Sequence, residues 1–118
     1  MSLLETFNHQ IQLLLEELTR ILPQEKDIFI FQSQLEMALI VNKKRAHDSF
    51  MCNIYPHRNE IMTEKEAFFL DKSNDLENDY MAKTIHMTHL WKDCLNEENK
   101  KIVWKYFKVL CLLADKMR

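Results

Sequence analysis

Apolar residues recur every three or four positions over residues 3 to 22, the spacing of one face of an α-helix. Ser2 and Glu5 precede this stripe with the spacing of a capping box, which satisfies free backbone N–H groups at a helix start. Pro23 ends the pattern, because proline cannot continue a helix. We predict an amphipathic first helix with the apolar stripe Leu4, Phe7, Ile11, Leu14, Leu15, Leu18, Ile21 and Leu22.

The middle of the chain predicts shorter helices separated by polar turns. A second helix is predicted within residues 26 to 44, although its start is rich in β-branched and aromatic residues. A third covers residues 45 to 54 and ends at Pro56, and a brief helix follows to Ile61. Thr63 and Glu66 have the spacing of a cap before a short turn at 68–70. The second helix has the predicted core face Ile28, Phe31, Leu35, Ala38 and Leu39.

Two long helices are predicted in the last third of the chain. The first covers residues 76 to 95, and Asn96 then caps a helix over residues 97 to 115. The apolar arc of this last helix spans roughly 220° at ~100° per residue, wider than the ~100° stripe of a surface helix. It holds two rows, the first of Ile102, Tyr106, Val109 and Leu113 and the second of Trp104, Phe107, Cys111 and Ala114.

So wide an apolar arc needs neighbours on two sides. One explanation is that the last helix lies at the centre of the bundle. The other is that its second row binds another molecule. For that case the predicted partner-binding residues are Trp104, Phe107, Cys111 and Leu112, the last lying among the lysines of the polar side.

Composition limits the fold. The 118 residues include no glycine and only two prolines, so tight strand turns and the glycine-based phosphate cradles of nucleotide-binding proteins are both disfavoured. Hydrophobic residues make up 47% and charged residues 29%, which suits one globular domain. We predict an all-α fold, a compact single domain over residues 1–118 with five to six helices.

Cysteine usage and hydropathy indicate where the chain resides. Cys52, Cys94 and Cys111 are odd in number and form no C-x-x-C pair, so we expect reduced thiols that fill space in the core of an intracellular protein. The start of the sequence shows no signal peptide, and no apolar run approaches the ~20 residues that cross a bilayer. We therefore expect a protein that is neither secreted nor bound to a membrane.

Asp79, His86, His89 and Asp93 share one side of the predicted helix 76–95. Two imidazoles and a carboxylate are suitable ligands for Zn²⁺ or Fe²⁺. The spacing nevertheless lacks the Glu-x-x-His pairs of bundle metal sites and the H-E-x-x-H pattern of zinc proteases. A solvated polar face is the favoured interpretation, and a metal-dependent enzyme ranks last. We expect no catalytic residue, cofactor, metal or small-molecule substrate.

Basic residues form two groups. Lys43, Lys44 and Arg45 follow the second predicted helix and are the candidate nucleic-acid-binding residues. The last helix carries a second group, Lys101, Lys105 and Lys108. Because the net charge is −2 and no base-reading pattern accompanies either group, nucleic-acid binding is the alternative function rather than the first.

Three stretches, at residues 14–27, 42–71 and 90–114, together resemble a group of small helical proteins encoded by giant nucleocytoplasmic large DNA viruses. The resemblance is carried most specifically by Tyr55-Pro56, by Phe68-Phe69-Leu70, and by Trp91 with residues 99 to 107. It implies a helical protein made in the host-cell cytoplasm or a viral factory, or packaged in the virion, and supplies no catalytic residue. We expect a non-enzymatic, virion-associated or protein-interaction module that binds a protein partner or itself.

Overall fold

The computed structural model describes residues 2–70 and 87–118, and these residues form helices and turns without a strand. The predicted all-α fold is therefore confirmed. The α-helices are α1 (Leu3–Ile21), α2 (Lys26–Val41), α3 (Arg45–Asn53), α4 (Arg58–Met62), α5 (Ala67–Leu70), α7 (Met87–His89) and α8 (Glu97–Met117). A 3₁₀ turn, η1 (Tyr55–His57), precedes α4, and a π-helical turn, η3 (Leu90–Cys94), follows α7.

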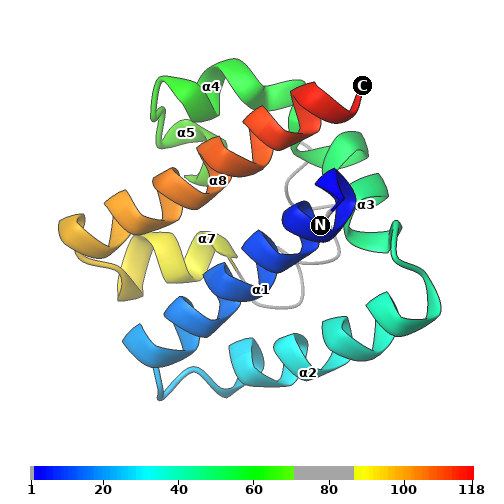
Figure 1. Cartoon of the computed structure of the whole chain (residues 1–118). Helices are drawn as coiled ribbons and strands as arrows, with labels where there is room; N and C mark the ends of the chain where they lie inside the picture. Colours follow the sequence, from blue (N-terminus) through cyan, green and yellow to red (C-terminus); the bar gives the residue numbers. More distant parts are fainter. Residues whose placement is uncertain (1, 71–86) are drawn as a thin grey trace.

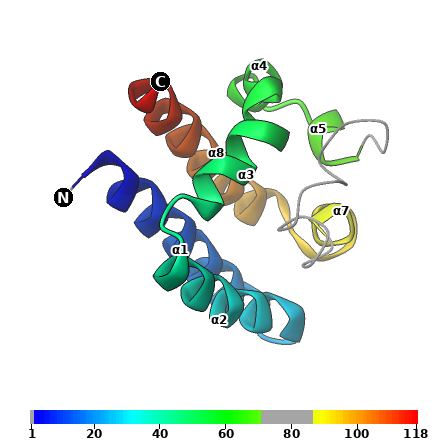
Figure 2. The ribbon, with the colours of Figure 1, turned by 90° about the vertical axis from the view of Figure 1, so that its right-hand side faces the viewer.

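Helix α1 lies in the middle of the bundle, with α8 on one side and α2 on the other (Figure 1). Both neighbours run antiparallel to α1, as Figures 1 and 2 show. Helix α3 packs against one end of α1 and α2, and α4 covers α8 from the side away from α2. This arrangement encloses one hydrophobic core, to which every α-helix contributes.

Ser2 caps the start of α1, as the sequence predicts. The backbone N–H of Glu5 donates to Ser2 Oγ at 3.1 Å, and Ser2 Oγ lies 3.3 Å from Glu5 Oε1. The helix ends at Ile21, and its C-terminal cap, Leu22, stands immediately before Pro23. Its stripe is buried at Phe7, Ile11, Leu14, Leu15 and Leu18, which places α1 at the centre of the core.

Helix α8 lies inside the bundle, so the first explanation of its wide apolar arc is the correct one. Trp104, Phe107 and Cys111 are all less than 5% exposed. The Phe69 ring packs 5.0 Å from Trp104 and 5.3 Å from Phe107, and Trp91 packs 5.0 Å from Trp104. The prediction that these three α8 side chains bind a partner is therefore wrong, because the chain itself already buries them.

Two local predictions need correction. Thr63 does not cap a following helix: its hydroxyl donates to the carbonyl of Asn59 at 2.8 Å at the end of α4. Cys52 is exposed rather than a core residue, whereas Cys111 is buried and Cys94 intermediate. The described part of the predicted helix 76–95 is helical from Met87 to Cys94, with a π-helical last turn, and residues 76–86 lie outside the described ranges.

Candidate functional site

The most exposed apolar surface lies on α2. Five of the nine large apolar side chains that are exposed within residues 2–70 and 87–118 belong to this helix. At about 100° per residue, all five fall within an arc of about 120°, so they share one face. We call this the α2 face, and it comprises Phe29, Ile30, Met37, Ile40 and Val41, with Ser33 between them.

The opposite side of α2 faces the core, where Ile28, Phe31, Leu35 and Leu39 are buried. The helix is therefore apolar around most of its circumference, a property normally found in helices with neighbours on all sides. The sequence pattern predicted the buried face of α2, and the exposed apolar face was not predicted. The signal was present in the runs 28–31 and 39–41, which are too continuously apolar for a one-sided helix.

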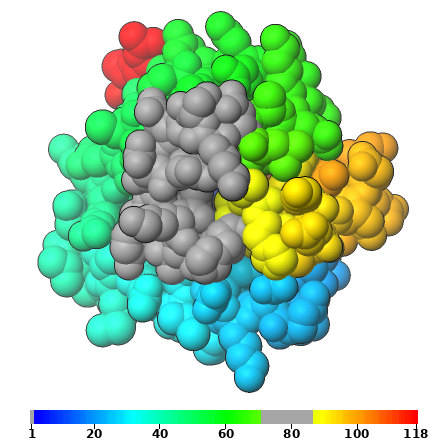
Figure 3. Space-filling view, turned by 180° about the vertical axis from the view of Figure 1, so that it is seen from behind, coloured from blue at the N-terminus to red at the C-terminus, as the bar shows by residue number. Residues whose placement is uncertain are grey.

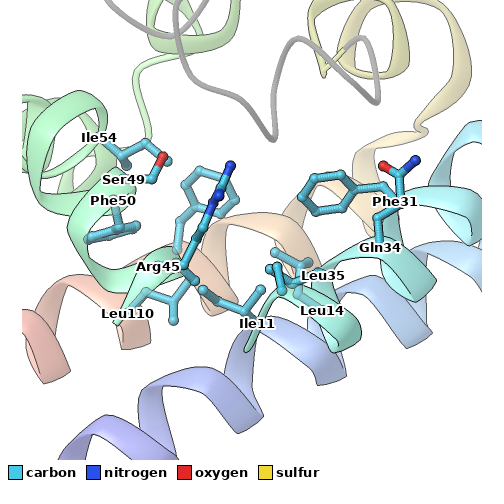
Figure 4. Close-up of a pocket in the computed structure, with 13 residues that line it drawn as sticks. Ile11, Leu14, Phe31, Gln34, Leu35, Arg45, Ser49, Phe50, Ile54 and Leu110 are labelled. Carbon is cyan, nitrogen blue, oxygen red and sulfur yellow. The ribbon is translucent and has the colours of Figure 1, made fainter. Parts of the chain in front are cut away.

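An apolar pocket of about 310 Å³ opens between α2 and α3. Figure 4 shows α2 supplying one wall with Phe31 and Gln34, and α3 supplying the other with Ser49 and Phe50. Ile11 lies in the floor. Its volume is at the lower end of the ~300–1,000 Å³ that is usual for ligand sites.

The predicted nucleic-acid-binding residues form the turn between α2 and α3. Lys43, Lys44 and Arg45 are exposed, and the side-chain amide of Asn8 holds the turn by donating to the carbonyl of Lys43 at 2.9 Å. Arg45 extends beside the pocket rather than away from the protein (Figure 4). The turn therefore offers two lysines and part of an arginine to solvent.

The lysines of α8 do not extend this basic turn. Lys108 Nζ lies 2.5 Å from Glu64 Oε2, so its charge is paired. Lys101 and Lys105 remain exposed, but they lie toward the α8 start, on the opposite side of the molecule from the α2–α3 turn (Figure 1). The two basic groups therefore do not merge into one surface. Leu112, the fourth predicted partner-binding residue, is exposed on α8.

The predicted metal ligands are only partly within the described residues. Asp79 and His86 lie outside the described ranges. His89 and Asp93 are exposed, and His89 Nδ1 lies 3.1 Å from Asp93 Oδ2. Two further contacts were not predicted from the sequence. Cys94 Sγ lies 3.6 Å from His89 Nε2 and 3.5 Å from Glu25 Oε1.

No family model, curated protein sequence or solved structure matches the chain. Within the described residues, no helix has the length and apolar content needed to cross a bilayer. Functional inference therefore rests on the surfaces and side-chain clusters of the fold itself.

Proposed function

We propose that this protein is a non-enzymatic interaction module that forms a homodimer through the α2 face. The observation that carries the proposal is the exposure of Met37, Ile40 and Val41, which are 71%, 83% and 89% exposed on one helix. A contiguous apolar patch costs free energy in water, and such patches commonly mark binding surfaces. Helix α2 lies at the margin of the bundle, where a second molecule can approach it (Figures 1 and 3).

The α2 face is complementary to itself. If two copies of α2 pair antiparallel about a twofold axis near residue 35, Met37 of each copy faces Ser33 of the other. A long, adaptable thioether thus fills the space above a small side chain. The same alignment brings Ile30 opposite Ile40 and Phe29 opposite Val41, so four of the five apolar residues of the face meet an apolar partner.

Charge also favours the antiparallel arrangement. The start of α2 carries two acidic residues and one basic residue, Glu25, Asp27 and Lys26, whereas the turn after it carries Lys43, Lys44 and Arg45. Antiparallel pairing places the net negative end of one helix near the positive turn of its partner. The helix dipoles then oppose each other as well, which is the favourable orientation.

The expected affinity is modest. Helix α2 has 16 residues and is therefore about 24 Å long. One helix pair of this length buries less than the ~1,200–2,000 Å² of a stable protein interface. We expect a reversible dimer with a dissociation constant of about 10⁻⁶ to 10⁻⁴ M, a range that corresponds to weak interfaces.

Sedimentation equilibrium at protein concentrations from about 1 μM to 1 mM tests the dimer. Met37→Glu should weaken dimerisation by at least ~30-fold, because it places a charge at the centre of a desolvated apolar contact. Leu112→Glu is the matched control, since Leu112 is also an exposed apolar residue but lies on α8. A wild-type protein that stays monomeric at 1 mM, or equal weakening by both variants, would refute the proposal.

Nucleic-acid binding through the basic turn is the alternative function. It predicts binding to duplex DNA or RNA that weakens steeply with salt and is lost on changing Lys43 and Lys44 to alanine. The resemblance to virus-encoded helical proteins supports a role in an infected cell under either function, in the host cytoplasm, a viral factory or the virion.

A further inference from the structure

We propose that Glu25, His89 and Cys94 form a binding site for Zn²⁺. Within the described residues these three side chains offer one carboxylate oxygen, one imidazole nitrogen and one sulfur atom, all within 4.8 Å of one another. They come from two places far apart in the chain, the α1–α2 turn and the π-helical turn. In the space-filling view these two segments adjoin (Figure 3).

The distances between donor atoms suit tetrahedral zinc. With Zn–S near 2.3 Å and Zn–N or Zn–O near 2.0–2.2 Å, two donors of a tetrahedron lie about 3.6 Å apart when one of them is sulfur. Cys94 Sγ lies 3.6 Å from His89 Nε2 and 3.5 Å from Glu25 Oε1. Two of the three donor–donor distances therefore already match a tetrahedral zinc site. The third, between His89 Nε2 and the Glu25 carboxylate, can shorten by a rotation of the Glu25 side chain, which is only partly buried.

The π-helical turn is what brings two of the ligands together. In an α-helix, residues five apart point about 140° away from each other. Between Leu90 and Leu95 the backbone instead closes an i to i+5 hydrogen bond of 2.9 Å, which widens the turn. Cys94 thereby comes to lie beside His89. Such π-helical turns are rare and occur frequently at functional sites.

Asp93 orients the histidine ligand. Its Oδ2 atom lies 3.1 Å from His89 Nδ1, so the ring nitrogen at the far side, Nε2, faces Cys94. A carboxylate that holds the other nitrogen of a zinc-bound histidine is a recurrent feature of zinc sites, because it fixes the tautomer and raises the basicity of the ligand. Asp93 therefore completes the site without contacting the ion.

The electrostatic environment favours a cation. Burial, together with the neighbouring carboxylates of Glu25 and Asp93, raises the pKa of the Cys94 thiol. Without a metal, the thiol therefore stays protonated at neutral pH and is a poor nucleophile. A divalent cation would offset the same carboxylates and bind the thiolate, releasing the proton to solvent.

The donor set selects the metal. Thiolate and imidazole prefer Zn²⁺ to Mg²⁺ or Ca²⁺, which prefer oxygen ligands. Three protein ligands leave the fourth tetrahedral position for water or an exogenous ligand. Because Glu25 precedes α2 and the other ligands precede α8, a bound ion would also link the α1–α2 turn to the turn before α8.

Titration of the purified full chain with CoCl₂ tests the site, since Co²⁺ reports thiolate ligation by a charge-transfer absorption band, and ZnCl₂ should displace it. We expect one ion per chain, with binding that tightens about tenfold per pH unit below the thiol pKa because one proton is released. Cys94→Ser should remove the band. Cys52→Ser is the matched control, since Cys52 is an exposed thiol elsewhere, and should leave the band unchanged.

Two further variants test the other roles. Glu25→Gln should weaken zinc binding at least 100-fold, and Asp93→Asn should weaken it about 10–100-fold while leaving the cobalt band in place. A band that survives Cys94→Ser, or binding unaffected by Glu25→Gln, would overturn the proposal. Circular dichroism confirms that each variant is folded. The site does not depend on dimerisation, so Met37→Glu should bind zinc like the wild type.

Discussion

Helices α8 and α2 are both apolar around much of their circumference, yet they have opposite surroundings. On α8, Trp104 and Phe107 are buried between α1, α5 and the π-helical turn. On α2, Met37 and Ile40 remain in water although the helix packs on α1 and α3. The same residue types thus form a core in one helix and an exposed face in the other.

The difference arises from position rather than from composition. Helix α8 lies between α1 and α4, so each side of its apolar arc has a neighbour. Helix α2 lies at the margin, where only its inward side does (Figure 1). Exposing apolar side chains to water costs free energy, so an apolar helix at the margin is less stable unless another molecule covers it. A wide apolar arc therefore indicates a need for two neighbours, without saying whether both belong to the same chain.

Alanine substitutions should give the largest difference in stability between α8 and α2. Phe107→Ala should lower the free energy of unfolding by about 3–5 kcal/mol, because it opens a cavity in the aromatic cluster. Ile40→Ala should change it by no more than about 0.5 kcal/mol, because the side chain is already in water. Urea denaturation at low micromolar protein, where a weak dimer dissociates, measures both. Similar losses in the two variants would contradict the distinction between them.

Substitutions at the cap residues of the two helices should change stability by a smaller amount than the core substitution does. Asn96 Oδ1 accepts from the N–H of Asn99 at 2.8 Å, so Asn96→Ala should cost about 1 kcal/mol of stability. Glu25 makes no side-chain cap bond to α2, and Glu25→Ala should cost less in zinc-free buffer. Asn96→Asp is the control, because aspartate caps as well as asparagine. Thermal unfolding measures the series, and an equal loss for Asn96→Asp would exclude capping as the cause.

Alkaline pH should give the smallest change in stability. This change tests whether the Cys111 side of α8 is buried from water. Burial raises the pKa of Cys111 from 9.0 to about 12. Above pH 9 the unfolded chain loses this proton while the folded chain keeps it, so stability falls as pH rises. Cys111→Ala should therefore lose less stability than the wild type between pH 8 and 10. Cys52→Ala, at an exposed thiol, should follow the wild type.

The sequence predicts the elements that depend on nearby residues. Ser2 and Pro23 fix both ends of α1, and Asn96 fixes the start of α8, because caps and breakers act within one helical turn. The segment around Thr63 misled the prediction, since its hydroxyl bonds to the helix before it rather than to the one after it. Capping residues can act at either end of a helix when two helices are close together.

The candidate sites depend on contacts that no local pattern reveals. Glu25 and Cys94 are 69 positions apart, and His89 reaches Cys94 only because the intervening turn is π-helical. Regular helical spacing, which grouped His89 with Asp93, could not supply either relationship. The exposed face of α2 was visible as an apolar run, but whether it is covered depends on the position of the whole helix.

The packing of α1 on α8 has a consequence for synthesis. Helix α1 is synthesised before α8, its most extensive neighbour. A nascent chain therefore carries the apolar stripe of α1 without its main cover until residues 97–117 have left the ribosome. Helices α2 and α3 can shield part of it earlier, since Phe7 packs against His47 and Phe50 of α3, but the side of α1 that contacts α8 must wait. Such delayed closure slows folding and makes the emerging chain a natural client for chaperones.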